Sequence, residues 1–146
     1  MSQTRVLVID NSKVARLILL AALRRADIES VACTDGWEVF TALREEPDLD
    51  PDVVLIEAEL PRLDGYRLIQ QLKTRTRLAH CTFIMVSRRD GILNLVKARL
   101  AGAAGYVTKP FDIKQVVAIV QEYLTAPPKQ GANAADPRTA RTTTPR

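Results

Sequence analysis

The sequence of 146 residues has little of what disulfide scaffolds or membrane spans require. Its two cysteines, Cys33 and Cys81, are too few for a disulfide framework and lack the spacing of metal ligands. The longest apolar run covers residues 17–23, whereas a membrane span needs roughly 18 to 20 apolar residues. The first apolar stretch meets Asp10 after only a few residues, so we expect no secretory leader. These absences predict a cytoplasmic protein with free thiols and without a membrane span.

A large excess of charge of one sign is also missing from most of the sequence. The formal net charge is +4, but residues 1–126 contain 17 basic and 16 acidic residues. The remaining excess lies in residues 127–146, which are rich in proline, alanine and threonine and have no large apolar side chain. We therefore expect a nearly neutral folded domain over residues 1–126, a disordered basic tail over residues 127–146, and no nucleic-acid partner.

Two kinds of apolar segment alternate along residues 1–126. Runs such as Val6–Ile9 are continuously apolar, which is typical of parallel strands that are buried on both faces. Between these runs, apolar residues recur at helical spacing, as in the segment that begins after Ser12 and ends with Arg24 and Arg25. The predicted strands cover residues 6–9, 29–33, 52–57, 82–87 and 106–108, and the predicted helices cover residues 13–25, 36–46, 65–73, 92–100 and 113–124.

This alternation predicts an α/β fold with a doubly wound, five-stranded parallel sheet and five helices. Each crossover between parallel strands is right-handed, and each helix must bury one side against the sheet. In open sheets of this kind, ligands bind outside the carboxyl ends of the strands. The residues that follow the strands are therefore the candidates for function.

Polar and charged residues stand at four of these strand ends. The first strand ends at Asp10 and Asn11, the third at Glu57, the fourth at Ser87 and the fifth at Lys109. Taken singly, each is more often a helix cap or a solvated loop residue. Taken together they meet at one edge of the sheet and predict a polar site there.

Five segments carry a more specific signal: VLVIDNSK at residues 6–13, PDVVLIE at 51–57, PRLDGY at 61–66, IMVS at 84–87 and AGAAGYVTKPF at 101–111. In this order and spacing they resemble the receiver domains of two-component response regulators. Residues 61–66 and 87–91 are most similar to the single-domain chemotaxis-type receivers of twitching motility and type IV pili. The resemblance implies a flavodoxin-like fold with strand order 2-1-3-4-5 and a protein partner such as a histidine kinase.

The resemblance also implies roles for the residues at the strand ends. In the family, a histidine kinase phosphorylates an aspartate at the end of the third strand, and an acidic pair after the first strand holds Mg²⁺. By position, Ser87 and Lys109 would bind the phosphoryl group, and Tyr106 would turn inward with the Ser87 hydroxyl. A cis peptide bond is implied between Lys109 and Pro110.

Two positions depart from the family pattern. The acceptor position holds Glu57, whose extra methylene moves the carboxylate by roughly 1.5 Å, and phosphoryl transfer depends on accurate positioning. Asn11 replaces the second acidic residue, which leaves Asp10 as the charged ligand of a weak or absent metal site and predicts no cofactor beyond weakly bound Mg²⁺. The longer Glu57 side chain would instead pair with Lys109 and imitate a phosphorylated aspartate.

These departures favour a signalling protein that is not an enzyme: an atypical receiver, or pseudo-receiver, that binds protein partners without phosphorylation. Its partner face would include Lys97, Tyr106, Lys114 and Glu122. Two alternatives stay open, namely an ordinary Mg²⁺-dependent phosphorylated regulator and a small flavodoxin-like enzyme, although no glycine-rich phosphate loop follows the first strand. A histidine kinase and a second copy of the chain, forming a homodimer, are candidate partners, and we expect no DNA-binding output domain.

Overall fold

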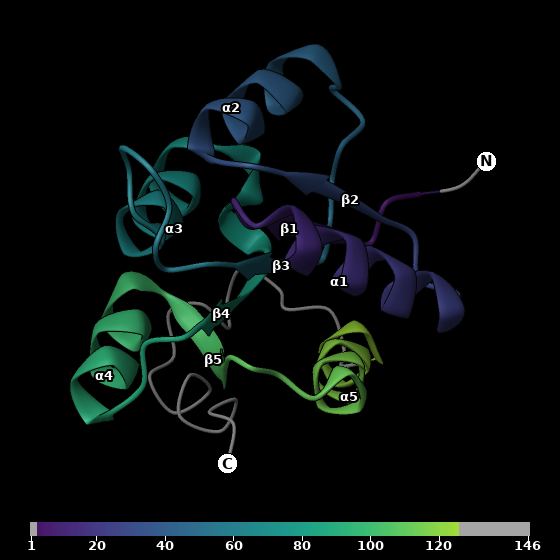
Figure 1. Cartoon of the computed structure of the whole chain (residues 1–146). Coiled ribbons are helices and arrows are strands. Elements are labelled where there is room, and N and C mark those ends of the chain that lie inside the picture. Colours follow the sequence, from purple (N-terminus) through teal and green to yellow (C-terminus); the bar gives the residue numbers. More distant parts are fainter. Residues whose placement is uncertain (1–2, 126–146) are drawn as a thin grey trace.

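Five parallel strands form a single sheet in the order β2-β1-β3-β4-β5 (Figure 1). The computed structural model describes residues 3–125, so the prediction of a disordered tail over residues 127–146 lies outside the described residues. The strand order is the flavodoxin-like order that the resemblance implies. The strands are β1 (Val6–Ile9), β2 (Ser30–Cys33), β3 (Val53–Ile56), β4 (Thr82–Ser87) and β5 (Ala103–Thr108).

The helices cross between successive strands, and α-helices that follow three of the strand-end loops begin at a Ser or Asp capping side chain. Ser12, Asp35 and Asp64 each accept a hydrogen bond from a backbone N–H group in the first turn of a helix. Within residues 3–125, no helix is long and apolar enough to span a bilayer. The helices are α1 (Lys13–Arg25), α2 (Gly36–Glu45), α3 (Gly65–Arg75), the short 3₁₀ helix η1 (Arg77–His80), α4 (Ile92–Ala101) and α5 (Ile113–Thr125).

Helices cover both faces of the sheet and form two separate apolar cores. Successive residues of β1 point to opposite faces, so Leu7 and Ile9 belong to one core and Val6 and Val8 to the other. The first core lies under α2, α3 and α4, and the second lies under α1 and α5 (Figure 1). The central strands are therefore buried on both sides, and their polar ends meet at the carboxyl edge of the sheet.

Both cysteines are buried and free, as expected. Cys33 ends β2 and Cys81 immediately precedes β4, and strands β1 and β3 lie between these two strands. Burial is the main cause that raises the pKa of each thiol to about 12. Neither thiol forms a reactive thiolate near neutral pH.

The structure departs from the predicted elements at one strand boundary and at one unpredicted helix. Strand β5 begins at Ala103 rather than at Tyr106, because pairing with β4 holds small residues in an extended form that their own propensities do not favour. The helix η1 was not predicted at all. Its four residues are too few to show a helical period. The Thr76 side chain that caps it lies next to it in the sequence and does not by itself indicate a helix.

Helix α4 has its large apolar side chains on the outside. Its buried residues are Ala98 and Ala101, whereas Ile92, Leu93 and Leu100 are 76%, 84% and 79% exposed. We expected every helix to bury an apolar side. In α4 the fully buried residues on that side are two alanines. Burial of large side chains does little to hold this helix against the sheet.

Candidate functional site

Four polar side chains that the sequence analysis selected lie together at the carboxyl edge of the sheet. Asp10 follows β1, Glu57 follows β3, Ser87 ends β4, and Lys109 follows β5. Asp10, Glu57 and Ser87 are buried, at 2%, 5% and 0% exposure. We call these four residues the pocket cluster.

The Lys109 ammonium lies between two carboxylates. Its Nζ atom donates to Asp10 Oδ2 at 2.8 Å and to Glu57 Oε1 at 2.7 Å. The Lys109 side chain is only 13% exposed, so both ion pairs are shielded from water. Charge-assisted hydrogen bonds of this length are among the stronger polar contacts in proteins.

The remaining carboxylate oxygens have backbone donors. The N–H of Ser12 donates to Asp10 Oδ1 at 2.9 Å, and the N–H of Glu59 donates to Glu57 Oε2 at 2.9 Å. All four carboxylate oxygens of the pair therefore accept a hydrogen bond from the protein itself. Residue 65 must be glycine at this edge, because a Cβ atom there would collide with the carbonyl oxygen of Glu57.

These contacts set the ionisation of the cluster. Burial alone would raise the pKa of Glu57, but hydrogen bonds from the Glu59 N–H, Lys109 and Ser87 outweigh it, and the pKa is lowered. Burial alone would lower the pKa of Lys109, but its bonds to Asp10 and Glu57 outweigh that effect and raise it. Glu57 is thus a carboxylate, and Lys109 an ammonium, at neutral pH.

The donor set does not fit a resident Mg²⁺ ion. This ion prefers oxygen ligands with free lone pairs in octahedral geometry, whereas the Lys109 ammonium already lies between Asp10 and Glu57. Asn11, the third candidate ligand, has an exposed side chain. Among the described residues, no group of three or more His, Cys, Asp or Glu side chains could hold a metal ion.

Tyr106 is half-buried and turned toward the pocket cluster. Its hydroxyl donates to the carbonyl oxygen of Arg89, and the N–H of Arg89 donates to Ser87 Oγ at 3.3 Å. Burial is the largest cause that raises the pKa of Tyr106 to about 12, so the phenol stays protonated. The peptide bond between Lys109 and Pro110 is cis, as the resemblance implies.

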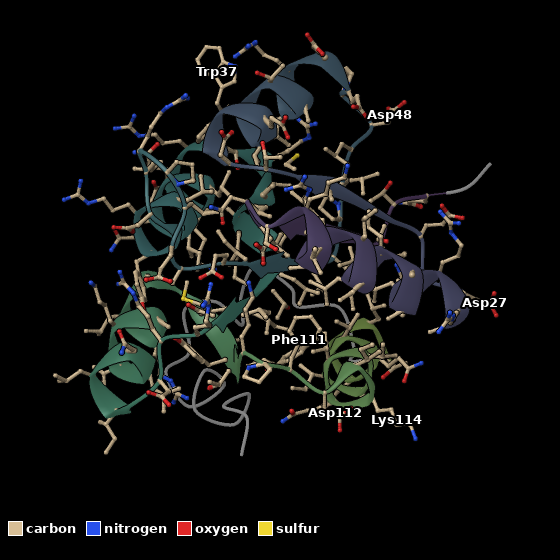
Figure 2. The ribbon with its side chains drawn as sticks, viewed as in Figure 1. Asp27, Trp37, Asp48, Phe111, Asp112 and Lys114 are labelled. Carbon is tan, nitrogen blue, oxygen red and sulfur yellow. The ribbon has the colours of Figure 1, made fainter. Side chains whose placement is uncertain are left out.

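The other residues of the predicted partner face lie on the surface around this edge. Lys97 of α4 and the α5 residues Lys114 and Glu122 are exposed, and Lys114 projects from the first turn of α5 (Figure 2). The sequence analysis did not predict that the exposed apolar residues of α4 belong to the same surface.

Two residues of functional interest were missed by the sequence analysis. Tyr66 is 4% exposed, and its hydroxyl donates to Asn94 of α4 at 3.3 Å. It lies in the PRLDGY segment, where a tyrosine in the first turn of a helix predicts packing but not a partner on another helix. Arg77 of η1 was missed for the same reason as η1 itself.

Comparison with known proteins agrees with the fold. The response regulator receiver domain family matches residues 6–121 of the chain. The chain belongs to this family. Receiver domains are generally signalling modules and not enzymes. In this receiver the pocket cluster lies at the carboxyl edge of the sheet.

Individual relatives extend this comparison. The receiver is 29% identical over 120 residues to Protein PilG of Pseudomonas aeruginosa, an alignment that covers 82% of this chain and 87% of PilG. It is 33% identical over 122 residues to Transcriptional regulatory protein CseB of Streptomyces coelicolor, covering 84% of this chain but only 50% of CseB. A Francisella response regulator receiver domain superposes with a TM-score of 0.73 at 25% identity, covering 83% of this chain and 96% of that structure.

Proposed function

We propose that this receiver works without phosphorylation, as a protein–protein interaction module in two-component or chemotaxis-type signalling. The observation that carries the proposal is the state of Glu57. Its two carboxylate oxygens accept hydrogen bonds from Lys109 and from the Glu59 N–H, and the side chain is buried. A carboxylate held in this way is a poor nucleophile toward a phosphodonor.

The contacts of Glu57 also support the idea that it imitates a phosphorylated aspartate. By the family resemblance, Lys109 and Ser87 bind the phosphoryl group, and both residues already contact Glu57. Tyr106 packs against the first core, and its hydroxyl donates to the carbonyl oxygen of Arg89, two residues after Ser87. This placement supports the inward orientation that the resemblance associates with the switched state. Together these contacts favour a receiver that stays in an active-like arrangement.

The output surface that we propose combines α4, β5 and α5. It presents the charged residues Lys97, Lys114 and Glu122 beside the exposed Leu93 and Leu100. Exposed apolar side chains with charged neighbours are typical of protein interfaces. A histidine kinase or another protein of a motility pathway would bind here, and the similarity to PilG supports this class of pathway.

The test rebuilds the missing parts of a phosphorylation site in two steps. Glu57→Asp restores the acceptor position, and Asn11→Asp adds the second acidic residue at the metal site. We expect no labelling of the wild type by acetyl phosphate or phosphoramidate, little labelling of Glu57→Asp, and clear Mg²⁺-dependent labelling of the double variant. The two changes should act more than additively, because acceptor and cation stabilise the same transition state.

Asn11→Asp alone is the matched control, since it adds the metal ligand but keeps the misplaced acceptor. Wild-type labelling as strong as that of the double variant contradicts the proposal. In that case the chain is an ordinary phosphorylated regulator, and mass spectrometry of Asp52, Asp64 and Glu57 identifies its acceptor.

A further inference from the structure

Trp37, in the first turn of α2, is the only exposed aromatic residue within residues 3–125. Its side chain is 70% exposed and projects away from the sheet (Figure 2). An indole ring in water leaves a large apolar area unburied, and contact with a partner would bury that area. The surface around Trp37 is therefore a candidate for protein binding.

This surface continues from α2 onto α3, because the two helices are close at both ends of α2. At the start, a Cβ atom on Gly36 would lie 3.2 Å from the Leu68 side chain of α3 and 3.8 Å from the side chain of Leu63. At the end, Arg77, which follows α3, donates to the carbonyl oxygen of Leu43 at 3.1 Å. The outer sides of α2 and α3 therefore belong to one surface.

Four arginines lie on this surface without an acidic partner. Arg44 is seven residues after Trp37, which is about two helical turns, so both side chains leave the same side of α2. Arg67 and Arg75 lie on α3, and Arg62 lies in the loop that leads to it. All four are exposed, and none forms an ion pair with a described residue. We call Trp37 and these four arginines the arginine face.

The acidic side chains near the arginine face do not pair with its guanidinium groups. Glu38 accepts a hydrogen bond from the Thr34 N–H at 2.7 Å, and Asp64 accepts one from the Arg67 N–H at 2.9 Å. Glu45 adjoins the face at the end of α2 but forms no ion pair with a described residue. The guanidinium groups are therefore free to bind carboxylates from outside, which they do with two parallel hydrogen bonds each.

Arg62 also has a backbone conformation that is unfavourable for its side chain. Its φ angle is 69°, in the left-handed region that favours glycine. Its guanidinium forms no hydrogen bond or ion pair with a described residue that would compensate for this strain. Strained residues without a structural contact are typical of binding sites.

We propose that the arginine face is a docking surface for an acidic segment of a partner protein. Carboxylates of the segment bind the guanidinium groups, and an apolar side chain of the segment packs on the Trp37 ring. Tryptophan and arginine are the residues most enriched at the energetic centres of protein interfaces. The inference goes beyond the proposed function, since α3 separates this surface from α4 (Figure 1). The receiver then has separate surfaces for two proteins.

A nucleic-acid strand fits this face less well than an acidic protein segment. Residues 1–126 are nearly neutral, with 17 basic and 16 acidic residues, whereas nucleic-acid binding needs a strong positive excess. Single strands also bind by stacking successive bases on several aromatic side chains. The arginine face offers Trp37 alone.

The test uses Trp37 as its own reporter, because it is the only tryptophan of the sequence. The probe is a short peptide of glutamate and aspartate with one central phenylalanine. We expect this peptide to shift the Trp37 emission of the full chain to shorter wavelengths, as the indole ring leaves water. The same peptide with glutamine and asparagine in place of the acids should leave the emission unchanged.

Variants then assign the binding to individual residues, with the affinity measured by anisotropy of the labelled peptide. Trp37→Ala should weaken binding about tenfold. Arg62→Gly should weaken it about threefold without lowering the melting temperature, because glycine adopts the positive φ angle without strain. Arg24→Ala is the matched control. It removes the same charge from an exposed position on α1, on the other face of the sheet, and should leave the affinity unchanged.

Three results overturn the inference. The first is an unchanged Trp37 emission with the acidic peptide, and the second is equal weakening by Arg24→Ala and Arg62→Gly, which indicates attraction by charge alone. The third is tighter binding of a single-stranded oligothymidylate than of the peptide, which assigns the face to nucleic acid. Self-association that Trp37→Ala abolishes in sedimentation would likewise replace the acidic partner by a second copy. None of these measurements involves the pocket cluster, so their failure is distinct from failure of the proposed function.

Discussion

Lys109 is the residue on which the state of the pocket depends most. It brings one positive charge to two buried carboxylates, those of Asp10 and Glu57. Without Lys109, two buried carboxylates would lose their ion-pair partner, and a buried charge without such a partner is very costly. The lysine therefore does in this receiver what a bound cation does in many acidic pockets.

The first prediction removes this charge. Lys109→Met should lower the free energy of unfolding by about 3 kcal/mol at pH 7, because it leaves two neighbouring carboxylates unpaired. The loss should be smaller at pH 5, because burial shifts the pKa of Glu57 upward once the Lys109 contacts that lower it are gone, and this favours the protonated form. Urea denaturation at both pH values measures this.

Lys114→Met is the control for this prediction, since Lys114 is an exposed lysine on α5. Its effect should stay within about 0.5 kcal/mol at either pH. An equal decrease in the free energy of unfolding in both variants would show that the Lys109 ion pairs do not stabilise the fold.

The second prediction concerns how the free energy of unfolding changes at acidic pH. The pKa of Glu57 is lowered in the folded protein from its usual value of 4.5. Its stabilising contribution is therefore complete above pH 4.5 and is lost as the pH falls through the folded-state pKa. Glu57→Gln lacks this contribution, so its stability should change less than that of the wild type as the pH is lowered below 4.5.

Urea denaturation of both proteins at several acidic pH values checks this. The difference between them should stay constant near neutral pH and shrink in acid. A difference that grows as the pH falls would mean that the pKa of Glu57 is raised rather than lowered.

At the scale of elements, η1 anchors the end of α2 through Arg77. The guanidinium donates to three carbonyl oxygens, those of Leu43 at 3.1 Å, Glu46 at 2.8 Å and Leu49 at 3.1 Å. The last carbonyl groups of a helix have no partner within the helix. Arg77 therefore provides hydrogen-bond donors for carbonyl groups at the end of α2 and in the loop that leads into β3.

The third prediction follows from the shape of this side chain. Arg77→Ala should lower the free energy of unfolding by about 1 to 2 kcal/mol, and Arg77→Lys should recover only part of the loss, because an ammonium cannot reach all three carbonyl groups at once. Chemical denaturation measures both effects. Arg67→Ala, at an exposed arginine of α3, is the control and should change stability by less than about 0.5 kcal/mol.

The elements themselves were largely predictable. Continuous apolar runs located β1, β3 and β4, and helical spacing located all five α-helices to within a few residues. Strand β5 was predicted too short because Ala103, Ala104 and Gly105 carry no strand preference of their own. The outward side of α4 could not be predicted, since periodicity shows that a helix has an apolar side but not which side faces the core.

At the scale of the whole molecule, both apolar cores are built from residues between Val6 and Val120. This leads to a fourth prediction, because residues 127–146 carry no large apolar side chain. Truncation after Ala126 should shift the melting temperature by no more than a few degrees. Differential scanning calorimetry checks it, and a larger fall would show that the tail contributes to folding.

The pocket cluster was predictable in its members but not in all of its contacts. The strand ends identified Asp10, Glu57, Ser87 and Lys109, and the length of glutamate suggested its pairing with Lys109. The contact of Lys109 with Asp10 and that of Tyr66 with Asn94 were not predicted. Both contacts depend on how side chains are oriented after distant segments have packed. A sequence pattern does not indicate those orientations.

The bridge between Lys109 and Asp10 also bears on how the chain is made. The two residues are 99 positions apart, so the contact joins the first strand to the segment that follows the last. A nascent chain that ends before β5 has both pocket carboxylates but not the ammonium that neutralises them. Its sheet edge therefore carries uncompensated negative charge until synthesis reaches Lys109. The ion pairs of Lys109 therefore form only in the finished domain, and we expect fragments that end before β5 to be cleaved by proteases faster than the finished domain.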